Sequence, residues 1–145
     1  MNILIVGGGL QALSVARSLK KERYSVIALL HRGDISTKSK YIDELYTIDI
    51  TPTYKKEYLS SVHRVLQVHA ISVIIPLSDV TAEFLSIHKV NLEHEYHLKC
   101  AIPNYDIFQK ANDKWQLMDL CKENFIPHPR TQLLTSSNLQ EAAGG

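Results

Sequence analysis

Cysteine is scarce in this chain, and its scarcity excludes two classes of small protein. The 145 residues include two cysteines, Cys100 and Cys121, and these have no C-x-x-C spacing. Disulfide-stapled secreted domains and zinc-ribbon domains both need more cysteine than this. Both residues lie in apolar patterns, so we expect reduced thiols in the core of a cytoplasmic protein.

The chain also lacks an excess of charge of either sign. Sixteen Lys and Arg residues oppose 15 Asp and Glu residues, which leaves a net charge of +1. Nucleic acids and membrane surfaces attract strongly basic proteins, so we expect neither as a partner. No apolar run is long enough to span a bilayer. Met1 leads directly into a predicted strand, so we also expect no signal peptide.

No catalytic or metal-binding constellation is recognisable in the sequence. The chain has seven histidines, but none forms a ligand pair at helical spacing, since His63 and His69 are six residues apart and face different ways. No Cys/His or Ser/His arrangement indicates a nucleophile. The sequence therefore predicts neither a catalytic residue nor a metal site.

A glycine-rich turn stands out near the start of the chain. Ile3-Leu4-Ile5-Val6 is typical of a strand buried on both faces of a parallel sheet. Gly7-Gly8-Gly9-Leu10-Gln11-Ala12 follows and reads G-x-G-x-x-A, a variant of the dinucleotide fingerprint. A helical pattern then runs from Leu10 to Lys21, so the segment predicts a βαβ unit with free N–H groups at its helix N-terminus. The other interpretation is that the glycines serve only a sharp turn and close packing.

Strand and helix patterns alternate along the next eighty residues or so. Strands are predicted at Ser25–Leu30, Leu45–Ile48, Val73–Ile75 and Lys99–Ile102, and helices at Tyr54–Ala70 and from Asp79, which can cap a helix with Val80, Phe84 and Ile87 on one face. This alternation predicts an α/β, Rossmann-like doubly wound parallel sheet of about five strands. Such sheets bind ligands at the carboxyl ends of their strands, here the glycine turn and the loop Pro76-Leu77-Ser78-Asp79.

The C-terminal part has a different character. Asn112-Asp113-Lys114-Trp115 opens a helix, and Ile126-Pro127-His128-Pro129 forces an extended exit from it. Leu117, Met118, Cys121 and Phe125 share one face of that helix, and Gln132-Leu133-Leu134 is strand-like. We expect residues 1–111 to form the Rossmann-like domain. Residues 112–145 are expected to form a helix and a linker that leads into a further, absent domain.

A dinucleotide-binding enzyme remains one alternative. Such an enzyme needs a carboxylate for the ribose at the end of the second strand. That strand ends Leu29-Leu30-His31-Arg32, and the first carboxylate after it is Asp34. Arg32 suits a 2′-phosphate, which keeps an NADP-dependent oxidoreductase open. A non-catalytic ligand-binding module is the other alternative.

Four motifs, taken in order, resemble a known family. Val6-Gly7-Gly8-Gly9-Leu10-Gln11, Pro76-Leu77-Ser78-Asp79, Asp113-Lys114 and Ile126-Pro127-His128-Pro129 are similar to the N-terminal, pre-ATP-grasp domain of ATP-grasp ligases. The likeness is to carbamoyl-phosphate-synthase-like carboxylate–amine ligases and to the pyrrolysine-biosynthesis ligase that joins two amino acids. It covers residues 1 to 131 or so.

The resemblance implies that a longer parent enzyme phosphorylates a carboxylate with ATP, after which an amine attacks the acyl phosphate. ATP and Mg²⁺ bind mainly between later domains, so we expect this fragment alone to be inactive and to bind no cofactor tightly. Small-molecule carboxylates and amines are the implied partners. A homodimer and a cytoplasmic location are compatible with the resemblance.

Site residues follow partly from the resemblance and partly from the fold. Gly8, Gly9, Leu10, Gln11, Ser78 and Asp79 are expected to line the site of the carboxylate-bearing substrate. Amides at a helix N-terminus favour an anion, and Asp79 suits an ammonium group. By resemblance, Lys114 binds ATP phosphates, and its other interpretation is an ordinary exposed helix lysine.

Overall fold

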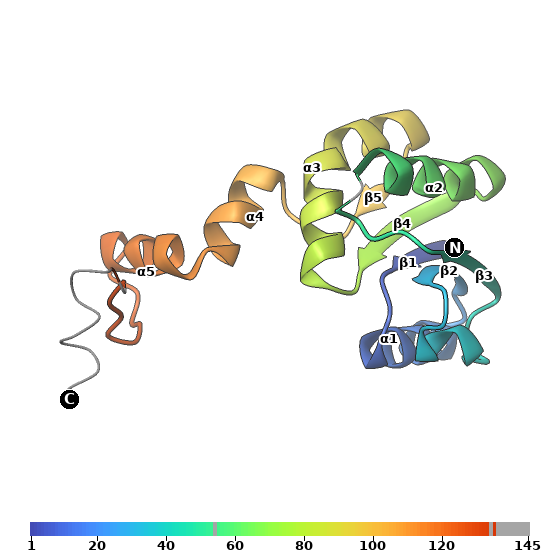
Figure 1. Ribbon diagram of the computed structural model, residues 1–145, viewed down its shortest axis with the longest axis horizontal. Coiled ribbons are helices and arrows are strands. Elements are labelled where there is room, and N and C mark those ends of the chain that lie inside the picture. Colours follow the sequence, from blue (N-terminus) through green and yellow to red (C-terminus); the bar gives the residue numbers. More distant parts are fainter. Residues whose placement is uncertain (54, 134, 136–145) are drawn as a thin grey trace. The chain divides into compact units, whose positions relative to one another are not determined.

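The computed structural model describes residues 1–53, 55–133 and 135, and it divides into two compact units, 1–105 and 106–145. Strands and helices alternate through the first unit (Figure 1). Its elements are β1 (Asn2–Val6), α1 (Leu10–Lys21), β2 (Ser25–His31), the 3-10 segment η1 (Ile35–Lys38), β3 (Glu44–Ile48), α2 (Lys55–Val68), β4 (Ile71–Pro76), α3 (Asp79–Tyr96) and β5 (Lys99–Cys100). No helix in the described ranges is long and apolar enough to cross a membrane.

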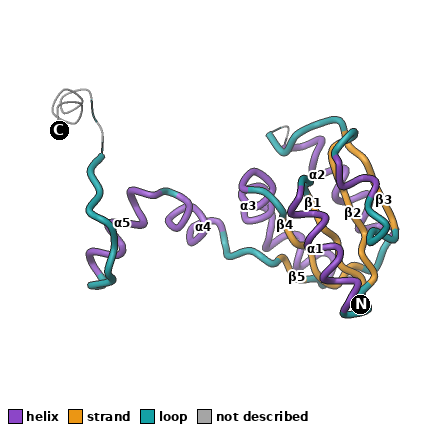
Figure 2. Tube along the Cα trace, turned by 90° about the horizontal axis from the view of Figure 1, so that it is seen from below, coloured by secondary structure: helices purple, strands orange, loops and turns teal. Residues whose placement is uncertain are grey.

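All neighbouring strands of the sheet are parallel, in the order β3-β2-β1-β4-β5 (Figure 2). Their carboxyl ends therefore lie along one edge. The chain moves outward from β1 to β2 and β3, and then returns to place β4 on the other side of β1. The point where the strand order reverses lies between β1 and β4, where open α/β sheets bind ligands. The predicted fold class, a Rossmann-like doubly wound parallel sheet, is confirmed.

Helices cover both faces of the sheet, with α1 on one face and α2 and α3 on the other (Figure 1). Ile5 and Ala28 point toward Ala12 and Ala16 of α1, whereas Leu4 and Val6 point into the core beneath α2 and α3. Since both faces are covered, β1 and β2 contain unbroken apolar runs, Ile3–Val6 and Val26–Leu30, rather than alternating apolar and polar residues. Each fully buried Leu or Ile contributes roughly 1.5–3 kcal/mol relative to an exposed side chain.

The first helix begins and ends where the sequence predicts, but the start of α3 differs from the prediction. Ser78, not Asp79, caps this helix: its hydroxyl accepts a hydrogen bond from the Thr81 amide at 3.3 Å, and the Thr81 hydroxyl accepts one from the Ser78 amide at 3.1 Å. Asp79 is the first helical residue. A hydroxyl one residue earlier reaches the third amide of the helix, which leaves the Asp79 carboxylate free of the capping role.

The buried face of α3 was predicted correctly at Phe84 but not at Val80. Val80 is 48% exposed, whereas Thr81, Phe84 and Leu85 are buried. The cap explains the difference, because it turns Thr81 against the glycine turn: a side-chain carbon built on Gly7 would lie 3.2 Å from the Thr81 hydroxyl.

Two other element boundaries are shorter than predicted. β5 ends at Cys100 because the Ile102 amide donates back to the Cys100 carbonyl at 2.8 Å and turns the chain away. α2 ends at Val68, before His69, and Tyr54 lies outside the described residues. Tyr58, Val62, Val65 and Leu66 supply the buried face of α2.

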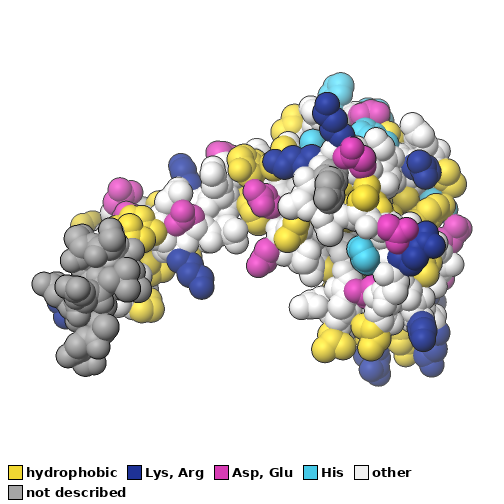
Figure 3. Space-filling model, in the orientation of Figure 1, with side chains coloured by type: hydrophobic (Ala, Val, Ile, Leu, Met, Phe, Trp, Pro, Cys, Tyr) yellow, Lys and Arg dark blue, Asp and Glu magenta, His cyan; other side chains and the backbone are white. Residues whose placement is uncertain are grey.

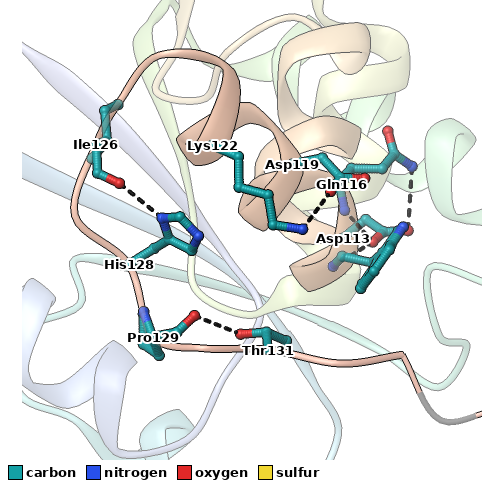
Figure 4. A network of polar contacts seen from close by, with 9 residues as sticks. Asp113, Gln116, Asp119, Lys122, Ile126, His128, Pro129 and Thr131 are labelled. Atoms are coloured by element: carbon teal, nitrogen blue, oxygen red, sulfur yellow. Dashed lines mark hydrogen bonds and ion pairs between the residues drawn. The ribbon is translucent and has the colours of Figure 1, made fainter.

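The second unit contains α5 (Lys114–Glu123) and nearly all of α4 (Tyr105–Asn112), a helix that the sequence analysis missed. Asp113 caps α5 by accepting hydrogen bonds from the amides of Trp115 and Gln116 at 2.9 and 3.0 Å (Figure 4). Neither helix has a buried residue, and Phe125, predicted on the apolar face of α5, is 94% exposed beyond its end. Gln132 and Leu133 are not in a strand, and Leu134 lies outside the described residues.

Candidate functional site

Two loops meet at the point where the strand order reverses. The Leu77 amide donates a hydrogen bond to the Val6 carbonyl at 2.9 Å, which joins the segment after β4 to the end of β1. Gly7 has φ +92° and packs against Thr81 and Ser78. Its left-handed conformation and the close approach both favour glycine at this position. The predicted convergence of the two loops is present in the structure.

An open hollow of about 430 Å³ lies beside this junction. It is lined by Gln11, Val15, Ile75, Pro76, Leu77, Ser78, Asp79, Ala82, Ala101 and Ile102. Most of these side chains are apolar, and Gln11, Ser78 and Asp79 supply the polar groups. An apolar concavity with a few polar groups is typical of a small-molecule site. Three of the six residues predicted for the substrate site therefore come together here.

The other three predicted residues do not line the hollow. Gly8 and Gly9 lie against Asp34, which comes from the loop after β2. The Gly9 amide donates to both carboxylate oxygens of Asp34, at 3.1 and 2.9 Å. A side-chain carbon on Gly8 would lie 2.1 Å from the nearer oxygen, so any larger residue there would displace the Asp34 carboxylate. The Leu10 side chain is 70% exposed.

Asp34 is held in this position by a network of donors. The Ser36 amide donates to Asp34 at 2.8 Å, and the Ser36 hydroxyl donates to the same carboxylate oxygen. Burial by itself raises the pKa of Asp34, but hydrogen bonds from the hydroxyl and amide of Ser36 and from the Gly9 amide outweigh it, so the pKa lies below its ordinary value. Asp34 is an ionised carboxylate within the glycine turn.

This arrangement disfavours the oxidoreductase alternative. A pyrophosphate approaching the glycine turn would meet the Asp34 carboxylate and a Gly9 amide that is already engaged. Arg32, the candidate for a 2′-phosphate, donates from Nε to Asp49 at 2.8 Å on the exposed edge after β2 and β3. The two residues that the dinucleotide interpretation needs are both committed to other partners.

One wall of the hollow depends on polar residues that the sequence analysis missed. Lys89 donates from Nζ to the carbonyls of Cys100 and Ile102 at 3.1 and 2.8 Å, and it pairs with Glu93 at 3.2 Å. Glu93 in turn accepts a hydrogen bond from the Cys100 amide at 2.9 Å. The pair fixes the segment that supplies Ala101 and Ile102 to the hollow. Its sequence signal was the Lys–Glu spacing of four residues on a helix.

Lys114 lies in the second unit, as the first residue of α5 and beside the capping residue Asp113. It is exposed and has no ion-pair partner among the residues with a described structure. Hydrogen bonds to its carboxylate, that from the Gln116 amide foremost, lower the pKa of Asp113. Within the described ranges, no group of three His, Cys, Asp or Glu side chains is placed to hold a metal ion.

The sheet is of the α/β class and carries a hollow at the point where the strand order reverses. Comparison with known proteins identifies relatives. No protein-family model matches the chain. The D-aspartate ligase of Enterococcus faecium (strain Aus0004) is 22% identical over 143 residues, which cover 94% of this chain and 33% of the ligase.

Solved structures give the same result. The biotin carboxylase domain dimer of the Hydrogenobacter thermophilus 2-oxoglutarate carboxylase, in complex with MgADP, ADP and bicarbonate, matches with a TM-score of 0.69 and 18% identity over 98% of this chain and 32% of that one. N5-carboxyaminoimidazole synthetase from Staphylococcus aureus, complexed with ADP, matches with a TM-score of 0.66 and 20% identity over 97% of this chain and 35% of that one.

These relatives are ATP-grasp enzymes, so the resemblance seen in the sequence is confirmed, and the property shared at this level of identity is the fold. The chain spans about a third of the length of each of them.

Proposed function

We propose that this chain is the N-terminal, pre-ATP-grasp domain of a longer ATP-dependent carboxylate–amine ligase and that it contributes part of the substrate site. The observation that carries the proposal is the hollow beside the ends of β1 and β4, where Gln11 at the start of α1 meets Ser78 and Asp79 at the start of α3. The likeness to D-aspartate ligase, a carboxylate–amine ligase, supports this chemical class.

In this proposal the hollow binds the carboxylate-bearing substrate. The amides of Leu10 and Gln11 open α1 and carry the positive end of the helix dipole. They have no hydrogen-bond acceptor within the described part of the chain. Gly8 and Gly9 shape the turn, and Asp34 fixes it. Asp79, relieved of capping by Ser78, is available for an ammonium group of the substrate.

Nucleotide and metal are assigned to the longer protein. Lys114 is exposed and is a suitable point charge for ATP phosphates. ATP would supply the phosphoryl group that activates the carboxylate, and the described residues offer no Mg²⁺ site. We propose that residues 112–145 lead into the domain that binds both, in a cytoplasmic enzyme acting on small carboxylates and amines. The biotin carboxylase relative is a dimer, which supports a homodimer here as well.

The test is Asp79→Asn in the longer protein, with amino acids as candidate substrates and ADP release as the readout. Removing a charge that binds substrate costs roughly 1.5–3 kcal/mol, which is about tenfold or more in kcat/KM. Asn keeps the size of the side chain, and Ser78 keeps the helix cap. Glu83→Gln, an exposed acid on the same helix that does not line the hollow, is the matched control. An unchanged kcat/KM in Asp79→Asn removes Asp79 from the site.

The proposed acyl-phosphate intermediate is tested separately. Hydroxylamine added in place of the amine converts an acyl phosphate into a hydroxamate. We expect hydroxamate formation that requires both ATP and the carboxylate substrate. ADP release without hydroxamate would contradict the reaction class while leaving the location of the site open to the Asp79 test.

A further inference from the structure

A second hollow, of about 300 Å³, lies on the outer side of α1, away from the glycine turn and from the hollow at Ser78. It is lined by Leu13, Ser14 and Arg17 of α1 and by Ser39, Lys40 and Tyr41, which follow η1. No residue is shared between the two hollows. The proposed ligase function makes no use of this second one.

The second hollow is basic. Arg17 and Lys40 are both exposed, and neither has an ion-pair partner among residues 1–53, 55–133 and 135. No residue that lines the hollow is acidic. The nearby carboxylate of Asp43 is already engaged, at 2.8 Å from Lys20 and 2.7 Å from the Val26 amide. Its charge is therefore not free to neutralise the hollow.

This local excess contrasts with the balanced charge of the whole chain. Lys and Arg side chains gather at the lower edge of the first unit, over α1, in Figure 3. Arg17 and Lys40 are the cations that line the hollow. Lys21, Arg23 and Lys38 lie on the same segments outside it, Lys20 is paired with Asp43, and Glu22 adds one negative charge. A concave site lined by one sign of charge concentrates ligands of the opposite sign.

Uncharged side chains in the hollow offer hydrogen bonds and apolar contacts in addition to the two cations. Ser39 accepts a hydrogen bond from the Tyr41 amide at 3.3 Å, so its own hydroxyl proton is directed elsewhere. Ser14 contributes a second hydroxyl. Lys40 Nζ lies 5.5 Å from the centre of the Tyr41 ring, and Leu13 is partly buried beside it. Two cations, two hydroxyls and an apolar wall are thus brought to one place.

We propose that this hollow binds a phosphate monoester of a small organic molecule. The guanidinium of Arg17 presents paired donors that match phosphate oxygens, and the Lys40 ammonium adds a point charge. Ser14 and Ser39 donate to the remaining oxygens. The organic part of the ligand packs on Leu13 and Tyr41.

The test uses the 145-residue chain and phenyl phosphate at low ionic strength, followed by amide chemical shifts and by calorimetry. We expect shifts centred on residues 13–17 and 39–41. Arg17→Gln and Lys40→Gln should each weaken binding about tenfold, the loss expected for one charged hydrogen-bonding partner. The controls Lys21→Gln and Lys38→Gln remove exposed charges that do not line the hollow, and they should leave affinity nearly unchanged.

Several outcomes overturn the proposal. Equal weakening by the control variants would show diffuse attraction to a basic surface. Shifts centred on Gly9 and Gln11 would assign the anion to the glycine turn. Inorganic phosphate binding as tightly as phenyl phosphate would exclude a role for the apolar wall. Circular dichroism of each variant confirms that it is folded, so that a loss of binding is not a loss of structure.

Discussion

The role of Asp34 could not be recognised from the sequence and is seen only in the structure. It lies three residues beyond β2, and in the sequence it was only the first carboxylate after that strand. In the structure it crosses to the neighbouring β1–α1 turn and binds the Gly9 amide through both oxygens. A free carboxylate at the start of a helix is a favourable partner for the helix dipole. The chain thus provides its own anion at this turn.

Gly8→Ala tests this contact. The added methyl group would lie 2.1 Å from the Asp34 carboxylate, so the substitution should destabilise the folded chain. Gly8→Ala made in an Asp34→Ala background should cost far less, because the clashing carboxylate is gone. Neighbouring residues in contact show coupling energies of roughly 0.5–3 kcal/mol in such cycles. The measurement is urea unfolding of the four proteins. Additive effects would mean that Asp34 does not occupy the turn.

His88 gives a pH dependence. Its Nε2 is buried and has no hydrogen-bond partner in the described part of the chain, and its ring packs on Phe84 with centroids 4.7 Å apart. Burial, with help from Lys55 and His63, lowers the pKa of His88 below its ordinary value of 6.5. Since the unfolded chain takes up a proton first, stability is complete above pH 6.5 and declines as the pH falls through 6.5 toward the lower folded-state pKa.

The corresponding variant is His88→Leu, in which that decline should be smaller. The free energy of unfolding is measured by urea denaturation between pH 7.5 and 5. The carboxylates of Asp34, Asp43 and Glu93 have lowered pKa values. The stability that they contribute is therefore lost at more acidic pH than the stability that depends on His88. An identical pH profile in wild type and variant would contradict the assignment.

At the scale of elements, β5 is held by α3 as well as by its pairing with β4. It has two residues; Lys89 donates to the Cys100 carbonyl and to that of Ile102 beyond the strand, and Glu93 accepts from the Cys100 amide. Burial raises the pKa of Glu93, but the Cys100 amide and Lys89 outweigh that effect and lower it. The charged pair therefore secures both the end of the sheet and one wall of the ligand hollow.

We expect Lys89→Met to loosen this wall. The substitution keeps much of the aliphatic side chain but leaves the Ile102 carbonyl and Glu93 without their cation. Amide hydrogen exchange of Cys100 and Ala101 should accelerate, while the amides of β1 stay protected. Lys122→Met is the control, since its pair with Asp119 is exposed and such pairs contribute little. Unchanged exchange at Cys100 would show that strand pairing alone holds β5.

The elements that were predicted correctly are those specified by residues close to them in the sequence. α1 has the predicted bounds because a glycine turn opens it and its apolar face repeats regularly, and β1 is an unbroken apolar run between clear boundaries. α4 was missed although its apolar residues recur with the helical period, because it has only eight residues and packs none of them into a core. The start of α3 was misplaced by one residue because Ser78 and Asp79 are both good caps, and the choice between them depends on how Thr81 packs on Gly7.

The candidate site was predictable only where it follows from topology. Gln11, Ser78 and Asp79 lie at the starts of the helices that follow β1 and β4, which a parallel sheet brings to one edge, and these three residues line the hollow. Asp34, Lys89 and Glu93 act through contacts across 25, 13 and 7 residues, which no local pattern specifies.

For the whole molecule, the chain matches about a third of each relative. The proposal assigns the nucleotide and metal to the rest of the enzyme, so the 145-residue chain alone should not hydrolyse ATP in the presence of Mg²⁺. Phosphate release is the measurement. Lys114→Ala is the control for any residual rate, because a contaminating ATPase would not respond to it. Hydrolysis that Lys114→Ala abolishes would place nucleotide chemistry within this chain and contradict the proposal.

The short length of β5 also affects whether the sheet of one molecule can pair with the sheet of another. An exposed sheet edge is a template on which a foreign strand can add, and proteins protect such edges with short strands and charged side chains. Here one edge strand has two residues and an exposed Lys99, and the other, β3, begins with an exposed Glu44. Growth of the sheet from one copy into the next is disfavoured at both ends. A dimer of this chain would therefore use its helices or loops, and concentrated solutions should resist β-type aggregation.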